Sequence, residues 1–413
     1  MQFTENAFAR PGREGGGSLR VLAVAGFCLA VLLTGCGGGG GSSSVGNAGE
    51  GETLSSVAGL GRKIFNDASL SASGLQSCAS CHESAHGHAA PNDLAAQFGG
   101  PNMDLQGGRL SPGIGYLAAN TPFFFDAEGT PTGGFFWDGR ARSLQDQAGQ
   151  PFLNPVEMAN TSKAEVIARL AATDYAGEFR LVFGDTVFSD VDGAYERMTL
   201  ALQRYQLEAP EFNAFTSKYD YFLLGKASLG VQEMRGLALF NNPAKGNCLA
   251  CHPSARGADG SMPMFTDFTY DSLGLPRNHE LGQNSDPNYF DLGLCARDTG
   301  DLLERKDLCG LFKVPTLRNV ALRHAYFHNG KFKTLKDAVT FYVQRDTHPE
   351  KYYPRNADGT VNKFDDLPAE YHRNVNTTEV PYDRKPGDAP ALSDDEVDDV
   401  VAFLKTLTDG YEP

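Results

Sequence analysis

Two pentapeptides in this chain combine cysteine and histidine at the same spacing. One contains Cys78, Cys81 and His82, and the other contains Cys248, Cys251 and His252. A c-type haem needs two thiols to add across its vinyl groups and an adjacent imidazole to reach the iron, and each pentapeptide supplies that set. A structural zinc site or a thioredoxin-like dithiol is the alternative, but zinc does not require histidine at the same offset twice. We therefore expect two covalently bound haems.

A helix is expected to precede each pentapeptide and to position it for its haem. The sequence before the first pentapeptide is repeated before the second. Residues 61–67 precede the first pentapeptide and residues 236–242 precede the second, and each segment has the form of a helix end followed by a loop. The two lead-ins differ in length, 78 − 61 = 17 residues against 248 − 236 = 12, as expected where an insertion falls in a surface loop. This internal repeat predicts two haem domains.

The rest of the sequence predicts helices between long loops. Ser162 and Glu165 form a capping box, and so do Ser393 and Glu396, the latter before apolar residues at helical spacing. Residues 91–134 and 253–313 are rich in glycine and proline without a sustained period, which is typical of loops that build a site or wrap a cofactor. We expect a mainly α fold of two cytochrome c-like haem domains, joined across an inter-haem interface, with long ordered loops.

The sequence divides into four parts. Residues 1–36 are predicted to be a signal peptide, because arginines precede an apolar run at 21–33 that is too short to span a bilayer comfortably. The run ends at Cys36 in a pattern that resembles the bacterial lipobox, so Cys36 is expected to carry a lipid; an ordinary cleaved signal is the alternative. Residues 37–52 form a Gly/Ser tether. The two haem domains are assigned to residues 53–220 and 221–413, which predicts an exported, periplasmic protein that is lipid-anchored to a bacterial membrane.

The composition is that of a folded, acidic protein. Charged residues make up 21% of the 413 residues and hydrophobic residues 41%, as in an ordinary globular chain. The formal net charge of −15 argues against a nucleic-acid partner. Cys295 and Cys309 lie outside the two pentapeptides, and in an oxidising compartment they are expected to form a structural disulfide, with free thiols as the alternative.

Three further stretches resemble the bacterial dihaem cytochrome c peroxidase family, which includes MauG. They are FFWDGRARSLQDQAGQPFLNPVEM at 135–158, FTDFTYDSLGLPRN at 265–278 and FKVPTLRNVALRHAYFHNGKFKTLKDAV at 312–339. The resemblance implies that His82 ligates the iron of a peroxide-reacting haem and His252 that of an electron-transfer haem. It also implies that Glu157 is the acid–base group and that Gln147, in the helix before it, is the family's catalytic glutamine, although most glutamates merely cap or salt-bridge a helix.

The sequence departs from the peroxidases of this family at both irons. Residues 99–122, where those enzymes often carry a distal histidine, contain none, and His86 and His88 follow the haem motif too closely to cross to the opposite face without strain. The first haem is therefore expected to be open. Eight residues past Thr334, 334 + 8 = 342, stands Tyr342 instead of the usual methionine, as in MauG, so Tyr342 is the predicted second axial ligand, with Met262 or Met264 as alternatives.

The resemblance implies further groups between the two haems. Calcium is usual there, and the matching positions are Asn120 and the carbonyls of Arg323 and Ala325, although Ala325 replaces a proline common in the family. His328 matches a family histidine that is more often a propionate or backbone partner than a ligand. Trp137, the only tryptophan, is implied to bridge the two haems, whereas its neighbours Phe135 and Phe136 alone would suggest packing.

Three functions remain open from the sequence. The first is a peroxidase that reduces hydrogen peroxide to water, with electrons from a small soluble cytochrome or copper protein passing from the C-terminal haem through Trp137 to the N-terminal haem. The second is a MauG-like oxidase that uses peroxide to oxidise aromatic residues of a partner protein, and the third is a non-catalytic dihaem electron carrier. Tyr342 and the missing distal histidine favour the second without excluding the first.

Overall fold

The computed structural model describes residues 54–413, so the predicted signal peptide, Cys36 and tether lie outside the described residues. The helices are α1 Ser56–Asn66, α2 Cys78–Cys81, α3 Leu144–Leu153, α4 Lys163–Ala171, α5 Ala176–Phe183, α6 Val191–Glu208, α7 Lys218–Leu223, α8 Val231–Asn241, α9 Leu335–Gln344 and α10 Asp394–Lys405. Three short antiparallel pairs are formed by β1 Phe98–Gly99 with β2 Leu105–Gln106, β3 Phe124–Phe125 with β4 Pro131–Thr132, and β5 Tyr270–Asp271 with β6 Phe312–Lys313. The described chain is thus rich in helix with few strands, as the sequence predicts.

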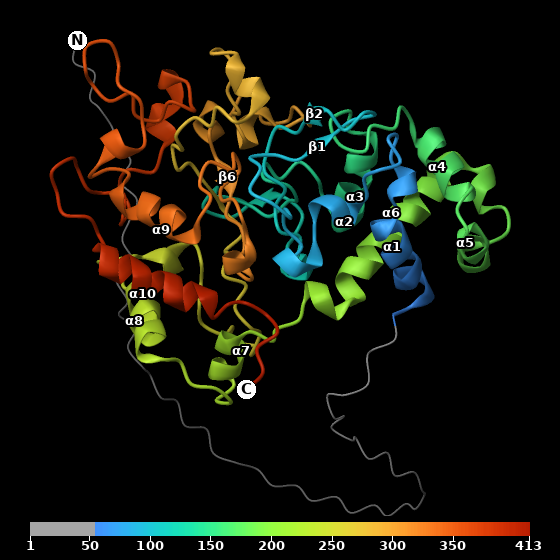
Figure 1. The fold of residues 1–413 in the computed structure, drawn as a ribbon, viewed down its shortest axis with the longest axis horizontal. Helices are drawn as coiled ribbons and strands as arrows, with labels where there is room; N and C mark the ends of the chain where they lie inside the picture. Colours follow the sequence, from blue (N-terminus) through green and yellow to red (C-terminus); the bar gives the residue numbers. More distant parts are fainter. Residues whose placement is uncertain (1–53) are drawn as a thin grey trace, which may run out of the picture. The chain divides into compact units, whose positions relative to one another are not determined.

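Each half of the described chain is built around one close helix crossing. A Cβ atom on Gly61 of α1 would lie 2.0 Å from the carbonyl oxygen of Ala201 in α6, and one on Gly236 of α8 would lie 1.9 Å from that of Asp399 in α10. Only glycine permits backbones to approach so closely. The two segments predicted to lead to the haem motifs are therefore equivalent helix ends, and Figure 1 shows α1 with α6 on one side and α8 with α10 on the other.

The apolar cores follow the same division. One cluster of buried residues runs from Leu60 to Phe212 and another from Tyr219 to Leu407. The boundary predicted between residues 220 and 221 lies close to the gap between these clusters, and it stays a prediction. Smaller clusters lie under the long loops, as expected where a loop wraps a site.

The predicted helix starts are present, with one difference in detail. Ser393 accepts a hydrogen bond from the amide of Glu396, and the Glu396 carboxylate accepts one from the amide of Ser393 (2.9 Å). Ser162 likewise accepts from the amide of Glu165, but the Glu165 carboxylate reaches one residue further back, to the amide of Thr161 (2.8 Å). Both arrangements satisfy amides that a helix start leaves without partners.

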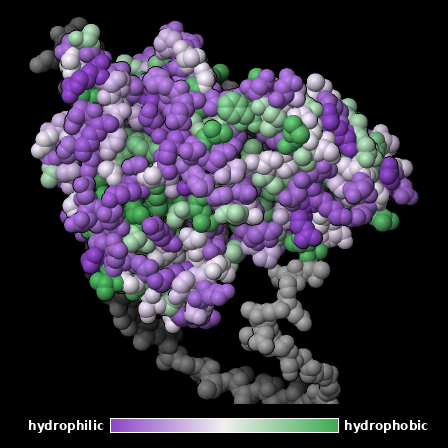
Figure 2. Space-filling model, viewed as in Figure 1, coloured by the Kyte–Doolittle hydropathy of each residue, from purple (hydrophilic) through white to green (hydrophobic). Residues whose placement is uncertain are grey.

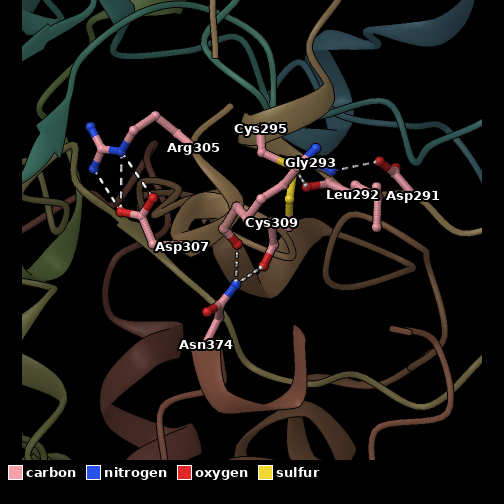
Figure 3. The surroundings of a disulfide bond; sticks show 9 residues. Asp291, Leu292, Gly293, Cys295, Arg305, Asp307, Cys309 and Asn374 are labelled. Atoms are coloured by element: carbon pink, nitrogen blue, oxygen red, sulfur yellow. Dashed lines mark hydrogen bonds and ion pairs between the residues drawn. A yellow bond between two sulfur atoms is a disulfide. The ribbon is translucent and has the colours of Figure 1, made fainter. Parts of the chain in front are cut away.

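The predicted disulfide between Cys295 and Cys309 is confirmed (Figure 3). It closes the loop of residues 295–309, and the Asn374 amide donates to the carbonyls of Lys306 (2.8 Å) and Cys309 (3.0 Å) from outside the loop. The loop also contacts the first half of the chain, because the Arg297 guanidinium lies 4.0 Å from the ring centroid of Phe123. The disulfide therefore fixes a loop that packs across the two halves.

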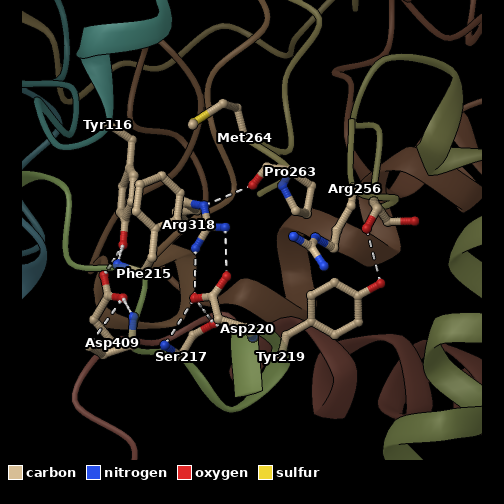
Figure 4. A network of polar contacts seen from close by, with 12 residues as sticks. Tyr116, Phe215, Ser217, Tyr219, Asp220, Arg256, Pro263, Met264, Arg318 and Asp409 are labelled. Atoms are coloured by element: carbon tan, nitrogen blue, oxygen red, sulfur yellow. Dashed lines mark hydrogen bonds and ion pairs between the residues drawn. The ribbon is translucent and has the colours of Figure 1, made fainter. Parts of the chain in front are cut away.

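A buried ion pair joins Asp220 of α7 to Arg318 (Figure 4). Arg318 and Asp220 have fully buried side chains and meet at 2.9 Å, and Arg318 Nε donates to the carbonyl of Pro263 (2.9 Å). Burial alone would raise the pKa of Asp220, but the hydrogen bonds and charge of Arg318 hold it below its usual value. The guanidinium also packs on the rings of Tyr116 and Phe215. A pair so fully satisfied fixes its surroundings in one arrangement.

The surface is mainly hydrophilic on the face drawn in Figure 2, with hydrophobic residues interspersed. Within residues 54–413 there is no helix long and apolar enough to cross a membrane.

Candidate haem-binding sites

The first haem motif lies in the wall of a cavity of about 390 Å³. Cys78 and Cys81 both line the cavity as free thiols, and His82 lines it beside them. Nδ1 of His82 lies 3.2 Å from the carbonyl oxygen of His88, and because a carbonyl only accepts, Nδ1 carries the proton. Burial lowers the pKa of His82 to about 4, so the ring is neutral with Nε2 free to bind a metal. The site has the donors that a c-type haem requires.

The second motif lines another cavity, of about 190 Å³, in the same manner. Cys248 and Cys251 are free thiols, and Nδ1 of His252 donates to the carbonyl of Phe265 at 2.7 Å. Burial lowers the pKa of His252 to about 4. Two equivalent donor sets, each with a neutral imidazole held by a backbone carbonyl, fit a haem in each half of the described chain.

Glu157 and Gln147 lie in the wall of the first cavity, as the sequence predicts for a shared site. Gln147 is carried by α3, and Glu157 follows the end of that helix. The Glu157 carboxylate accepts a hydrogen bond from the Asn154 amide at 2.9 Å. Burial raises the pKa of Glu157 against the opposing charge of Arg140. A carboxyl group in a cavity wall, with its pKa raised by burial, can both take and return a proton.

Trp137 lines both cavities. Its indole N–H donates to the carbonyl of Leu110 at 2.8 Å, and its own carbonyl accepts from the amide of Lys313 at 2.8 Å. Leu110 and Lys313 also line both cavities. The only tryptophan of the chain therefore stands in the wall that the two cavities share, with its ring orientation fixed by a hydrogen bond.

A chain of buried charges beside Trp137 was not predicted from the sequence. Asp138 contacts Arg109 at 2.6 Å and Arg140 at 3.0 Å, and Arg109 also contacts Asp291 at 2.6 Å. Burial alone would raise the pKa of Asp291, but the charge of Arg109 lowers it to about 2. Arg109 and Asp291 are 182 residues apart in the chain, so only the position of Asp138 next to Trp137 could have suggested the network.

Tyr342 of α9 lines the second cavity, and neither Met262 nor Met264 is among the residues that line it. Burial raises the pKa of Tyr342 well above its usual value. Its ring packs 5.5 Å from that of Phe327 and 6.1 Å from that of Tyr382. The phenol of Tyr342 is therefore better placed than either methionine to face the second haem.

Each cavity is lined by a turn of the same form, and the sequences of the two turns correspond. FFWDGRARSL at 135–144 corresponds to YFHNGKFKTL at 326–335. Phe136 and Phe327 both have positive φ, 66° and 65°, and so do Gly139 and Gly330. The first residue of each turn bridges to its seventh, Phe135 to Ala141 and Tyr326 to Phe332. The turns end in equivalent helix caps, Ser143 for α3 and Thr334 for α9.

This repeat relates the residues that face the two cavities. Tyr342 stands eight positions after its cap, 334 + 8 = 342, and the same count from Ser143 gives Pro151, 143 + 8 = 151. Pro151 lines the first cavity as Tyr342 lines the second. Proline has no side-chain donor atom. The helix that presents a phenol in one half thus presents an inert ring in the other, which fits the expectation of an open first site and of Tyr342 as the ligand at the second.

We expect a Pro151→Tyr substitution to close the first site. The new phenol would lie in the first cavity, at the position of α3 that is equivalent to Tyr342 of α9. The oxidised holoprotein should then lose its high-spin signal and its reaction with peroxide. Electron paramagnetic resonance and the absorption change on adding peroxide measure the two effects. Pro151→Ala is the matched control and should leave the site open. A high-spin, peroxide-reactive Pro151→Tyr protein with an unchanged melting temperature would contradict the equivalence.

The other histidines near the first motif lie away from its cavity. His88 is buried and stacks on Phe212 with ring centroids 3.9 Å apart, and His86 pairs with Glu83 at 2.6 Å. Within residues 54–413, His82 is the sole histidine that lines the first cavity. The arrangement agrees with the expectation of an open first site.

The groups predicted to bind calcium are engaged within the chain. The Asn120 amide donates to the carbonyl of Gly134 (2.7 Å), and its oxygen accepts from the amide of Thr121 (3.0 Å). The carbonyl of Arg323 accepts from the Tyr326 hydroxyl (2.9 Å). Within residues 54–413 no hydrogen bond joins Asn120 to Arg323 or Ala325, and calcium binding stays a prediction.

His328 takes the position of Trp137 in the second turn. It lines the second cavity and stacks on Phe312 with ring centroids 3.4 Å apart. Burial lowers its pKa to about 3. The amide of Leu110, whose carbonyl binds the Trp137 indole, donates to the carbonyl of His328 (2.8 Å). The two equivalent residues are therefore connected through one backbone segment.

The chain is similar to several known proteins. Residues 55–228 match the family described as di-haem cytochrome c peroxidase. The chain is 37% identical to methylamine utilization protein MauG of Paracoccus denitrificans over 86% of this chain and 90% of that protein. It is 31% identical to cytochrome c551 peroxidase of Nitrosomonas europaea, over 68% and 71%. The crystal structure of the diheme peroxidase BthA from Burkholderia thailandensis is similar with a TM-score of 0.78 and 40% identity, over 86% of each chain.

Proposed function

This chain belongs to the di-haem cytochrome c peroxidase family and is an oxidoreductase of the peroxidase type. From that premise we propose that it reduces hydrogen peroxide to water in the first cavity, with electrons that enter at the second cavity and pass through Trp137. The observation that carries the proposal is that the Trp137 side chain lines both cavities. An indole can lose and regain an electron, so it can pass electrons between two redox sites when it lies in the wall between them.

The family implies two c-type haems, and the donor sets of the two cavities fit them. When bound, the haems supply an iron that takes up peroxide at the first site and a centre that stores and passes electrons at the second. The residues that would hold them are Cys78, Cys81 and His82 in the first cavity, and Cys248, Cys251, His252 and Tyr342 in the second.

Glu157 would move the protons of the reaction. It takes a proton from one oxygen of hydrogen peroxide and returns it to the other as the O–O bond breaks. Two electrons and two protons then convert one peroxide molecule to two molecules of water. Gln147 lines the same cavity and offers an amide that can orient the peroxide by a hydrogen bond. The raised pKa of Glu157 suits this exchange.

Tyr342 supports a second candidate, a MauG-like oxidase that withdraws electrons from aromatic residues of a partner protein. A phenolate is a hard, anionic ligand that favours oxidised iron, so a site closed by Tyr342 is suited to holding oxidising equivalents. A non-catalytic electron carrier is the third candidate.

We further propose that the protein is exported to the periplasm and held to a membrane by a lipid on Cys36. Its partners would be hydrogen peroxide and either a small soluble electron-donor protein or a protein substrate. These proposals rest on the sequence of residues 1–52 and on the family, and calcium between the haems rests on the family alone.

A peroxide titration of the oxidised holoprotein tests the proposed function. Either enzyme should show a high-spin ferric population that disappears on adding peroxide, because the first site is open. Steady turnover with a small reduced cytochrome or copper protein is expected for the peroxidase. A long-lived oxidised state that no soluble donor discharges would support the MauG-like oxidase instead. Purely low-spin haem that ignores peroxide would leave only the electron carrier.

A further inference from the structure

Lys313 binds both ends of the segment 134–137, which carries Trp137. Its backbone amide donates to the carbonyl of Trp137 at 2.8 Å, and its ammonium donates to the carbonyl of Gly134 at 2.6 Å. The two carbonyls lie three residues apart, at the start and end of the segment 134–137. One residue from the C-terminal half therefore fixes this segment of the N-terminal half at two points.

The strand pair that carries Lys313 makes further contacts with the same turn. Lys313 of β6 stands opposite Tyr270 of β5, and the Tyr270 hydroxyl donates to the carbonyl of Gly133 at 2.6 Å. The amide of Gly133 donates to the carbonyl of Phe268 at 2.9 Å. Cross-strand neighbours thus bind consecutive carbonyls, Gly133 through a phenol and Gly134 through an ammonium.

The turn needs such support because its backbone is strained. Phe136, directly before Trp137, has φ of 66°, a region that residues with a side chain adopt rarely. Strained residues persist only where the surroundings over-determine their conformation. The Phe136 ring is covered by the Arg140 guanidinium at 3.7 Å, and the opposite edge of the turn is held by Lys313.

The ammonium of Lys313 packs against two aromatic rings. It lies between the rings of Phe135 and Phe268, 5.6 and 5.4 Å from their centroids, and no carboxylate among residues 54–413 forms an ion pair with it. Burial lowers the pKa of Lys313 to about 7. The ammonium donates a charge-assisted hydrogen bond to the Gly134 carbonyl, beside the one that this carbonyl accepts from the Asn120 amide at 2.7 Å.

We propose that Lys313 is the positioning residue of Trp137, which its ammonium holds in the wall between the two cavities through the carbonyl of Gly134. The inference rests on the proposed function only where it concerns electron transfer through Trp137. Its structural part is independent, because the geometry of the indole can be measured without any turnover.

Ultraviolet resonance Raman spectra of the holoprotein test the structural part. Trp137 is the only tryptophan, so the indole N–H band reports the hydrogen bond to Leu110 and the ring-torsion band reports the orientation of this one side chain. We expect both bands to shift in Lys313→Met and to return in Lys313→Arg, which keeps a cationic donor. Lys333→Met is the matched control, because Lys333 also donates to a carbonyl at 2.6 Å, that of Asp93, but lines neither cavity.

A double-mutant cycle tests the functional part. Lys313→Met should slow electron transfer between the two haems by about ten-fold or more, since small misplacements of a positioned group are costly. In a Trp137→Phe background the same substitution should have no further effect, because a residue that acts through Trp137 cannot act without it. Transfer is followed by stopped-flow absorption, and the melting temperature checks the fold.

Distinct results separate failure of this inference from failure of the proposed function. Unchanged indole bands in Lys313→Met would overturn the positioning role, whatever the rate of transfer. The positioning role would also be overturned if Lys313→Met shifted the haem midpoint potentials equally in the unaltered protein and in Trp137→Phe. Lys313 would then act on the haems directly. Shifted bands with no effect of Trp137→Phe on transfer would uphold the positioning role and reject Trp137 as the electron path.

Discussion

Replacing Glu157 by glutamine is expected to lower the rate of peroxide reduction by roughly 10²–10⁴-fold, the range for losing a positioned acid–base group. The amide keeps the size of the side chain and can still accept the hydrogen bond from Asn154, but it cannot take a proton. Stopped-flow absorption of the holoprotein with peroxide measures the rate. Glu178→Gln is the control, because Glu178 is exposed, pairs with Lys63 on the surface and lines neither cavity.

The same variant should change the dependence on pH. The carboxylate form of Glu157 must accept the first proton, so the rate of the unaltered protein should fall as the pH drops through the pKa of this group. Burial raises that pKa, which moves the loss of activity to a higher pH than an ordinary glutamate would give. In Glu157→Gln this acid limb should be missing. A variant that keeps its rate, or keeps the same acid limb, would show that another group carries the proton.

Replacing Trp137 by phenylalanine is expected to leave the fold and both haem spectra intact but to uncouple the two sites. Phenylalanine fills most of the space but does not lose an electron at a potential that the indole reaches, and it forms no hydrogen bond to Leu110. We expect electron transfer between the haems to slow by more than about ten-fold, which corresponds to about 1.4 kcal/mol in the barrier. Following both haem absorption bands after mixing with peroxide separates reaction at the first site from oxidation at the second.

Trp137→Tyr is the informative companion to that variant. A phenol is also oxidisable, so it should restore part of the coupling that phenylalanine loses. Coupling that survives fully in Trp137→Phe would show that Trp137 is a packing residue and that electrons take another route. Equal losses in both variants would instead indicate that the exact geometry of the indole, and not its redox chemistry alone, is required.

Much of the site could be predicted because its chemistry depends on short spacings. The haem motifs bring thiols and imidazole together within five residues, and the expected helix starts depend on four-residue caps. The count of eight from Thr334 to Tyr342 is equally local, and the matching count from Ser143 to Pro151 was available in the sequence once the turns 135–144 and 326–335 were compared. That comparison supports the prediction of an open first site and of a second site closed by Tyr342.

The shared wall between the cavities could not be predicted in this way. Lys313 and Gly134 are 179 residues apart, and Arg109 and Asp291 are 182 apart, so no local pattern relates them. By itself the sequence predicted where haem is attached and which helices lead to it, because those properties depend on covalent spacing and periodicity, whereas the residues expected to face each haem were implied by the family resemblance. Only the tertiary structure decided that Trp137 lines both cavities and that Lys313 holds it there, because such contacts arise when distant segments pack against one another.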